Sequence, residues 1–359
     1  MHLVFDARMA DGGALHGLAR YLSKVLHWGL VYRPQHRVQL LTCQPQAWSG
    51  LVEAHPQLSL LPVACPPFHW REHWELARAL SRSRADLAFF PSLAGPLWSP
   101  VPYCMTVPDL IPWHYPRSPL VKPYLALVSR WRAWRALELV AISQFTAREA
   151  NRLLGVSPGK LQVIYLGGLD LPRAAAGPAV RQRPYFLCVT NPKPHKNLSV
   201  LLEAFSGLEH ACDLVLVCPP APALDSLPPA VERLHGLSDE TLAGLYQGCL
   251  AAVVPSLYEG FGLPALEAMQ LGAPVVVANS SSLPEVVGEA GLYFDPANPE
   301  ELRKQLRSLL ENSARAASLS EAGKARATLF SWDQCCRTHW DWFEKLQARK
   351  SVSASRARS

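Results

Sequence analysis

The chain alternates short apolar runs with segments of helical periodicity, and this pattern occurs twice. In the first half, apolar runs of strand length lie at residues 3–7, 38–42, 86–91, 102–109 and 137–143. Segments between them, such as 17–31, place apolar residues at helical spacing. Strands that alternate with helices are typical of a parallel sheet with helices on both faces. The first half therefore predicts a doubly wound α/β domain.

The same alternation restarts after residues 166–183, which are rich in Gly, Pro, Ala and Arg and resemble a linker. Later apolar runs lie at 184–190, 213–218, 250–256 and 274–280, and a length of 359 residues suits two domains. We expect a Rossmann-like domain at 1–170, a linker at 171–183, a second Rossmann-like domain at 184–346 and a disordered basic tail at 347–359. Ligands bind at the carboxyl ends of such strands, so both domains are expected to face a central cleft.

Composition excludes several classes of protein. No run of about 18 apolar residues is present, and the first residues lack the features of a signal peptide. The nine cysteines include no Cys-x-x-Cys pair and no His/Cys cluster at metal spacing. These features predict a cytoplasmic protein with reduced, buried thiols.

Charge is distributed unevenly along the chain. Residues 1–175 contain 18 Lys/Arg and 10 Asp/Glu, a net charge of 18 − 10 = +8, whereas residues 176–359 contain 17 and 19, a net charge of 17 − 19 = −2. The basic half indicates either an anionic partner, such as a phosphate-bearing acceptor or a membrane surface, or simply solvated arginine-rich helices. No nucleic-acid-binding module is present, so we expect no nucleic-acid partner.

Two glutamates in the stretch PSLYEGFGLPALEAMQLG, residues 255–272, point to a ligand site. Glu259 precedes a Gly-Phe-Gly turn, and Glu267 lies about one turn into a helix that begins at Pro264 and ends before Gly272. Unpaired N–H groups at the start of a helix attract phosphate. A loop carboxylate beside them can accept hydrogen bonds from sugar hydroxyls, and a carboxylate on the helix can bind a ribose.

Seven motifs, taken in order, resemble those of retaining glycosyltransferases of family 4, which have the GT-B fold. They are DARMADGGALHGLARYL, TVPDLIPWHYP, VAISQFTAREA, VIYLGGLD, VTNPKPHKNL, PSLYEGFGLPALEAM and SSSLPEVVGEAGLYFDP. A lone Glu-x7-Glu pair is weak evidence, but seven motifs in the family's order are strong. A dinucleotide-dependent oxidoreductase is disfavoured, because no Gly-x-Gly-x-x-Gly follows the first strand.

The resemblance implies that a hexose, mannose or glucose, is transferred from a nucleotide-diphosphate sugar with retention at the anomeric carbon. The acceptor would be a saccharide or a polyprenyl- or lipid-linked sugar in cell-surface polysaccharide or glycolipid synthesis. The leaving diphosphate is then stabilised by protein donors. No cofactor and no metal are implied, since the sequence has no Asp-x-Asp loop.

The resemblance also assigns roles to individual residues. Glu259 and Lys196 would act in catalysis, at the sugar hydroxyls and the diphosphate, together with Asp109 as an orienting carboxylate or base near the acceptor. For Asp109, a turn-capping role is an equal alternative. The donor-binding set is Gly260, Phe261, Gly262, Leu263, Glu267, Lys193, Gly12 and Gly13.

The acceptor side of the resemblance contains one departure. Ser143 and His114 are expected on this side, but Pro108 stands where many family members have a histidine. Proline supplies neither a backbone N–H nor an imidazole. A catalytically silent GT-B protein that binds a nucleotide sugar or acts as a scaffold is therefore the alternative function.

The segment 117–137 mixes tryptophan with arginine at helical spacing. This pattern is typical of peripheral contact with the inner face of a membrane, or with a lipid-linked acceptor. The alternative, slightly preferred from the sequence, is a helix that packs its aromatic side chains on the first domain.

Overall fold

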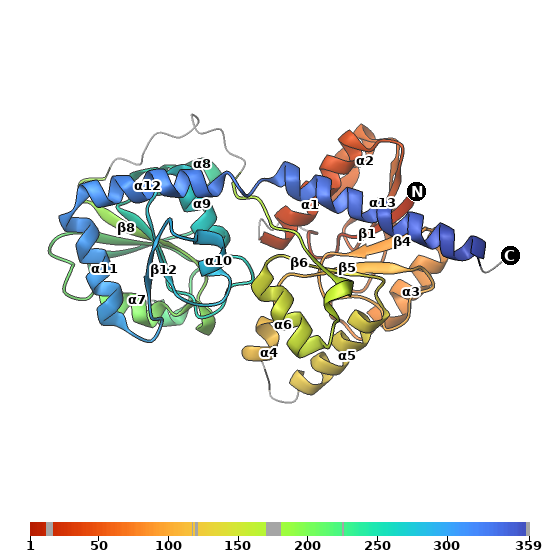
Figure 1. Ribbon diagram of the computed structural model, residues 1–359, viewed down its shortest axis with the longest axis horizontal. Helices are drawn as coiled ribbons and strands as arrows, with labels where there is room; N and C mark the ends of the chain where they lie inside the picture. Colours follow the sequence, from red (N-terminus) through yellow and green to blue (C-terminus); the bar gives the residue numbers. More distant parts are fainter. Residues whose placement is uncertain (12–16, 117, 119–120, 170–180, 225, 357–359) are drawn as a thin grey trace. The chain divides into compact units, whose positions relative to one another are not determined.

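The computed structural model describes residues 1–11, 17–116, 118, 121–169, 181–224 and 226–356, which form two compact units. Unit 1 comprises Met1–Gly167 and Ser331–Ser359, and unit 2 comprises Gly168–Phe330 (Figure 1). Residues 171–180, most of the expected linker 171–183, lie outside the described residues. Among the described residues, no helix is long and apolar enough to cross a membrane.

Unit 1 contains a seven-stranded parallel sheet in the order β3-β2-β1-β4-β5-β6-β7. Its strands are β1 (His2–Asp6), β2 (Arg37–Thr42), β3 (Leu58–Pro62), β4 (Leu87–Phe90), β5 (Tyr103–Val107), β6 (Leu139–Ala141) and β7 (Leu161–Val163). All five strands expected from the sequence are present. Strands β3 and β7 lie at the two edges and were not expected, because each is short and only partly buried.

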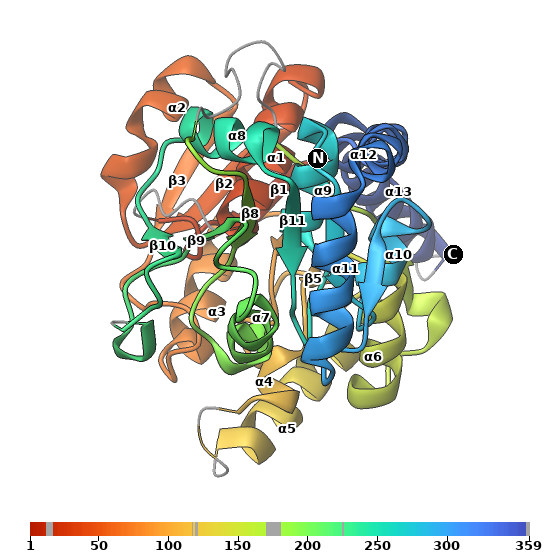
Figure 2. The same cartoon turned by 90° about the vertical axis from the view of Figure 1, so that its left-hand side faces the viewer.

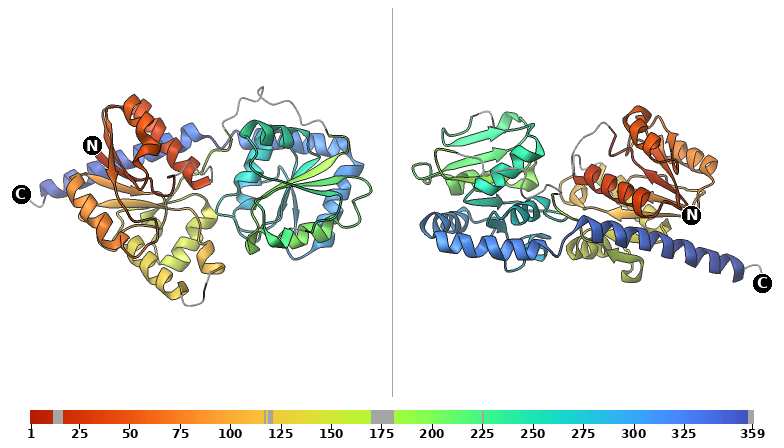
Figure 3. Two further views of the ribbon diagram at one scale, coloured as in Figure 1. Left: turned by 180° about the vertical axis from the view of Figure 1, so that it is seen from behind. Right: turned by 90° about the horizontal axis from the view of Figure 1, so that it is seen from above.

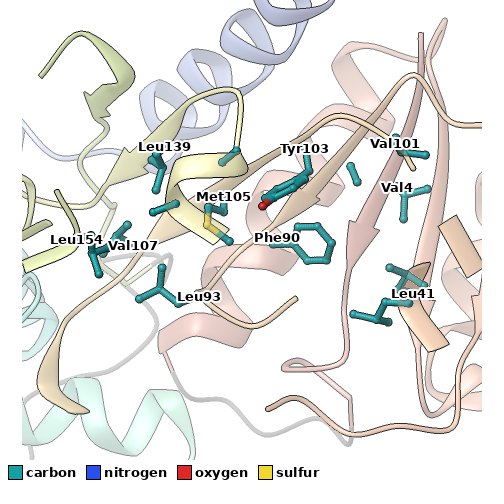
Figure 4. Packing of buried hydrophobic residues seen from close by; sticks show 14 of the residues in the cluster. Val4, Leu41, Phe90, Leu93, Val101, Tyr103, Met105, Val107, Leu139 and Leu154 are labelled. Carbon is teal, nitrogen blue, oxygen red and sulfur yellow. The ribbon is translucent and has the colours of Figure 1, made fainter. Parts of the chain in front are cut away.

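The helices of unit 1 cover both faces of this sheet. They are α1 (Gly17–Tyr32), α2 (Ser49–Ala54), α3 (Glu72–Ser83), α4 (Ile111–His114), α5 (Val121–Arg135), α6 (Gln144–Leu154) and α13 (Trp332–Arg356). Side chains alternate across a strand. Val4 and Phe90 belong to the cluster packed with α3, α5 and α6 (Figure 4), whereas Phe5 and Phe89 contact Phe343 of α13 from the other face.

The end of the chain corrects two expectations. Residues 331–346 belong to unit 1 and not to the second domain, and the segment from 347 continues α13 as far as Arg356 (Figure 3). The physical reason is the apolar face of α13, which lies along α1 and buries Trp340, Trp342 and Phe343 against unit 1. Helical periodicity in the sequence shows that a helix follows the last strand of the second domain. It does not show which of the two sheets that helix covers.

Unit 2 contains a six-stranded parallel sheet in the order β10-β9-β8-β11-β12-β13. The strands are β8 (Tyr185–Val189), β9 (Asp213–Val217), β10 (Val231–Leu234), β11 (Ala251–Val254), β12 (Val275–Ala278) and β13 (Leu292–Phe294). The helices are α7 (Leu198–Phe205), α8 (Asp239–Gly248), α9 (Leu263–Leu271), α10 (Leu283–Val287), α11 (Pro299–Glu311) and α12 (Ser313–Ala327). Both units therefore have the doubly wound α/β architecture expected from the sequence.

Candidate functional site

The strand order of unit 2 reverses between β8 and β11, the neighbours labelled together in Figure 2. From β8 the chain builds outward to β9 and β10, and then returns to add β11, β12 and β13 on the other side. Loops that leave such a switch point diverge and leave room for a ligand at the carboxyl ends of the strands. The loop after β8 carries Lys196, and the loop after β11 carries Glu259, so the topology brings the two predicted residues to one edge.

The loop after β8 is held against the loops after β11 and β13 by the side chain of Asn197 and by one backbone hydrogen bond. It contains a short 3-10 helix, Pro194–Lys196, and ends at Asn197 with a left-handed φ of 56°. The Asn197 amide donates to the carbonyls of Pro255 at 3.1 Å and Pro296 at 2.8 Å. The N–H of Leu257 donates to the carbonyl of His195 at 2.8 Å. These bonds fix where the side chain of Lys196 begins.

Lys196 and Glu259 form an ion pair at this edge. The Lys196 ammonium lies 2.7 Å from Oε1 of Glu259, and the two side chains are only 13% and 11% exposed. The hydroxyl of Ser256 donates to the same carboxylate oxygen at 2.7 Å. A largely desolvated ion pair interacts more strongly than one at the surface, so the pair is a strong local electrostatic feature.

Three consecutive serines after β12 hold the Glu259 loop. Glu259 donates its backbone N–H to the hydroxyl of Ser281 at 2.9 Å, and the hydroxyl of Ser282 donates to the Glu259 carbonyl at 2.9 Å. The hydroxyl of Ser280 donates to the carbonyl of Ser256 at 2.7 Å. We call Ser280–Ser282 the serine segment. Sequence analysis placed this segment in a family motif but gave it no role.

Helix α9 begins where the sequence predicts. Gly262 precedes it with a left-handed φ of 103°, Pro264 lies in its first turn, and Gly272 ends it with a φ of 82°. The Glu267 side chain is buried, and the Tyr246 hydroxyl lies 3.5 Å from its Oε2. Burial, and next the charge of Glu267, raise the pKa of Tyr246 well above its ordinary value. Tyr246 therefore stays a neutral donor beside the carboxylate.

The remaining donor-side residues differ in how they are placed. Phe261 is buried, and its ring lies edge-on to that of Phe330 with the centroids 5.7 Å apart, so its side chain packs inside unit 2. Gly260 precedes it on the loop, and Leu263 is the first residue of α9. Lys193 is exposed just before the 3-10 helix. Burial, and next the charge of Lys196, lower the pKa of the neighbouring His195 to about 4, so its imidazole is neutral at pH 7. Gly12 and Gly13 lie outside the described residues.

The residues expected on the acceptor side follow strands β5 and β6 of unit 1. Asp109 accepts a hydrogen bond from the N–H of Ile111 at 3.0 Å, which is the turn-capping arrangement. Ser143 is fully buried and caps α6 by accepting from the N–H of Thr146, so its side chain has a structural role. Nε2 of His114 lies 2.6 Å from Oε2 of Glu149.

The geometry is suited to binding an anionic, hydroxyl-bearing ligand. A lysine ammonium and the start of α9 favour phosphate, and the buried carboxylates of Glu259 and Glu267 accept hydrogen bonds from hydroxyls. Within the described residues, no group of three or more His, Cys, Asp or Glu side chains could hold a metal ion. The sequence reasoning gave no role to Ser256, Asn197 or Tyr246. Ser256 and Asn197 lie within quoted motifs, but their hydrogen-bond partners depend on the fold, and Tyr246 lies outside every motif.

Comparison with known proteins gives matches to both halves of the chain. Residues 17–167 match the family model for "Glycosyltransferase Family 4", and residues 183–312 match that for "Glycosyl transferases group 1". Together these matches cover most of the chain, in the order in which the two units occur.

Two curated relatives are mannosyltransferases by name. The MMP alpha-(1->4)-mannosyltransferase of Mycolicibacterium hassiacum is 34% identical over 252 residues, 65% of this chain and 60% of the relative. The O-antigen chain mannosyltransferase B of Escherichia coli is 32% identical over 219 residues, 55% of this chain and 58% of the relative. The chain thus spans less than two thirds of the length of either relative.

A solved structure shares the fold over nearly the whole chain. Anabaena HepE, determined in complex with UDP-glucose, superimposes with a TM-score of 0.74 over 96% of this chain and 100% of its own, at 18% identity. At this identity the likeness shows the fold alone.

Proposed function

Because the chain belongs to glycosyltransferase family 4, whose members have the GT-B fold, we propose that it is a retaining hexosyltransferase that uses a nucleotide-diphosphate sugar. The single observation that carries this proposal is the Lys196–Glu259 pair at the switch point of unit 2, beside the start of α9. The two mannosyltransferase relatives favour mannose over glucose as the transferred sugar. The acceptor is a saccharide or a lipid-linked sugar in cell-surface polysaccharide or glycolipid synthesis.

In this proposal the leaving diphosphate binds Lys196 and the N–H groups of the Gly260–Gly262 turn. As the bond between the anomeric carbon and the phosphate oxygen breaks, negative charge accumulates on the diphosphate, and a preorganised ammonium stabilises that charge. The diphosphate replaces the Glu259 carboxylate as the partner of Lys196. Glu259 is then able to accept hydrogen bonds from the hydroxyls of the sugar.

Glu267 would hold the nucleoside. Its carboxylate lies on the first turns of α9, and two carboxylate oxygens match the two hydroxyls of a ribose. The neutral Tyr246 hydroxyl beside Oε2 keeps that oxygen oriented. Lys193 would supply further positive charge near the phosphates, and Asp109 would orient the acceptor.

The decisive experiment measures nucleotide release from a panel of GDP- and UDP-sugars with the full chain. Lys196→Ala is expected to lower kcat/KM by about 10²–10³-fold, in line with the loss of one transition-state donor. Glu267→Ala should weaken donor binding, and Glu259→Ala should lower turnover more than donor binding. Lys304→Ala, on α11, is the matched control for loss of a lysine. If the three site variants keep wild-type kinetics, as the control should, the site assignment is wrong.

The alternative is a protein that binds a nucleotide sugar without transferring it, which Pro108 favours. Isothermal titration calorimetry separates the two functions. Binding of a nucleotide sugar with no nucleotide release from any donor, in the presence of saccharide and lipid-linked acceptors, would establish the silent protein and exclude the enzyme.

A further inference from the structure

Helix α5 presents large apolar side chains to solvent. Tyr124, Leu127, Trp131 and Trp134 follow one another at spacings of three and four residues and are 49%, 71%, 46% and 66% exposed. The opposite face of the helix is buried and includes Val128, Ser129, Arg132 and Ala133. The sequence interpretation in which this helix packs its tryptophans on the first domain is therefore wrong.

Arg132 sets the rotation of α5 about its axis. Its guanidinium is buried, 2.5 Å from Oε1 of Glu72 on α3 and 2.8 Å from the carbonyl of Leu93. Glu72 also pairs with the buried Arg8 at 3.3 Å. Turning the aromatic stripe inward would break this network and leave buried charges unpaired, which is strongly unfavourable. The outward stripe is thus a fixed feature of the fold.

The exposed apolar area continues from α5 to the start of α3, both labelled on unit 1 in Figure 1. Trp70 and Trp74 are 61% and 51% exposed, with ring centroids 4.7 Å apart. A hydrogen bond of 3.1 Å joins Nε2 of His73 to the hydroxyl of Tyr124. We define the aromatic surface as Trp70, Trp74, Tyr124, Leu127, Trp131 and Trp134.

Positive charge lies beside the part of the aromatic surface that α5 contributes. Lys122, Arg130 and Arg135 are exposed on α5 itself. Residues 110–137 contain no aspartate or glutamate. The exposed side of α5 therefore combines tryptophan and leucine with side chains of one sign of charge.

We propose that the aromatic surface docks on a lipid bilayer that contains anionic lipids. Tryptophan and leucine enter the boundary between headgroups and acyl chains, while long lysine and arginine side chains reach the phosphates above it. Positive charge also attracts the helix to an anionic leaflet. The helix would lie in the plane of the interface.

Local hydrogen bonds make this surface suited to lipid. The indole N–H of Trp131 already donates to the carbonyl of Leu97 at 2.7 Å, so the ring loses no water partner when it leaves the aqueous phase. The Arg130 Nε donates to the carbonyl of Leu153 at 2.8 Å, and this bond holds one of the three exposed basic side chains of α5 in place. A protein partner would need acidic groups opposite three basic side chains, whereas an anionic bilayer supplies negative charge without a defined register.

The test is flotation of the full chain with vesicles of phosphatidylcholine alone or with about 30% phosphatidylglycerol, an anionic lipid that gives the vesicle surface a negative potential. The wild-type chain should float with the anionic vesicles, more weakly at high salt, and with a blue shift of tryptophan emission. The double variant Trp131→Ser/Trp134→Ser should bind at least about tenfold more weakly. Arg130→Gln/Arg135→Gln should bind about 10–30-fold more weakly, because each charge near the surface contributes about fivefold.

Controls in unit 2 carry matched changes. Leu329→Ser removes another exposed apolar side chain, and Arg307→Gln/Arg315→Gln removes the same charge from α11 and α12. Both should bind vesicles as the wild type does. Equal binding of the wild type to neutral and anionic vesicles, or equal binding by the α5 variants, would overturn the proposal. So would a dimer in sedimentation velocity that the tryptophan variant dissolves, because the occupant would then be a second copy of the chain.

This docking does not depend on the proposed transferase activity. Vesicle flotation needs no sugar donor, and nucleotide release from a soluble donor can be measured with the same α5 variants. If the α5 variants lose vesicle binding but release nucleotide as the wild type does, the aromatic surface serves in docking and not in catalysis. If the wild type binds vesicles but releases nucleotide from no donor, the docking proposal stands and the transferase proposal is excluded.

Discussion

Gly262 is the residue whose conformation the candidate site most requires. It links the Glu259 loop to α9 with a φ of 103°, a region that costs other L-residues about 1–2 kcal/mol. A Cβ at this position would also lie 2.9 Å from Cδ2 of Leu283 on α10. Both the backbone conformation and the contact with Leu283 therefore disfavour a side chain at this position.

We predict that Gly262→Ala lowers the free energy of unfolding of unit 2 by about 2–4 kcal/mol, from backbone strain plus the clash with Leu283. Gly207→Ala is the matched control, because Gly207 has a φ of 93° and nothing within 4 Å of an added Cβ. It should cost only the strain, about 1–2 kcal/mol. Denaturant titration measures both, and equal losses in the two variants would show that the Leu283 contact relaxes freely.

At the residue scale, the sequence predicted the identities of Lys196 and Glu259 but not their pairing. Their approach depends on the strand order, which brings the loops after β8 and β11 together although the residues are 63 positions apart. Local spacing contains no such information. For the same reason the bond from Ser256 to Glu259 could not be foreseen, even though the two residues are close in sequence.

At the scale of elements, the serine segment positions the Glu259 loop from a neighbouring strand. Both backbone groups of Glu259 are bonded to it, the N–H to Ser281 and the carbonyl to Ser282. Ser281 itself has a left-handed φ of 52°, which turns the segment at this point. A loop fixed at both its N–H and carbonyl has little freedom to move the carboxylate it carries.

We predict that Ser282→Ala lowers kcat about tenfold while changing the Kd of a nucleoside diphosphate less than about twofold, because small displacements of a reacting group are costly in rate. Loss of this buried hydrogen bond should also cost about 1–3 kcal/mol of stability. Ser238→Ala removes the N-cap of α8 and costs about 1 kcal/mol without touching the Glu259 loop. A kcat that falls equally in both variants would mean that stability, and not positioning, controls the rate.

The elements themselves were largely predictable, because a strand buried on both faces reads as a continuous apolar run. Strands β4, β5, β11 and β12 are fully buried and match the expected runs. The orientation of α5 was not predictable. The buried face of α5 carries Arg132 and small side chains, whereas its tryptophans face outward. This arrangement is the opposite of the usual one, in which the apolar stripe of a helix faces the core.

At the scale of the whole molecule, the chain ends in the unit in which it began. Trp340 of α13 is fully buried in unit 1, stacks on His36 at 5.7 Å and donates its indole N–H to the carbonyl of Val25 at 2.8 Å. Gly29 of α1 leaves the space for this ring, since a Cβ there would lie 1.8 Å from it. The core of unit 1 therefore includes side chains of α13 as well as those of α1.

The same helix makes the stability of unit 1 depend on pH. His339 is fully buried, and its Nδ1 lies 2.8 Å from the Cys335 carbonyl, so Nδ1 carries the proton and Nε2 accepts from the Tyr21 hydroxyl at 2.6 Å. Burial lowers the pKa of His339 to about 4. The ordinary value of about 6.5 applies in the unfolded chain, which therefore binds the proton first as the pH falls.

We predict that His339 makes the free energy of unfolding of unit 1 fall by up to about 3 kcal/mol between pH 6.5 and pH 4, because each pKa unit corresponds to about 1.4 kcal/mol. Between about pH 7 and pH 8 its contribution should be constant. His339→Gln should be less stable at pH 8 but should lose less on acidification, since an amide does not titrate. His27→Gln, at an exposed position on α1, should keep the wild-type dependence. Denaturant titrations at pH 8, 6 and 5 measure the slopes.

Because His195 gives unit 2 a similar low pKa of about 4, the readout must be specific to unit 1, such as the near-ultraviolet signal of Trp340 and Trp342. Parallel slopes for the wild type and His339→Gln would show that another group in unit 1 takes up the proton.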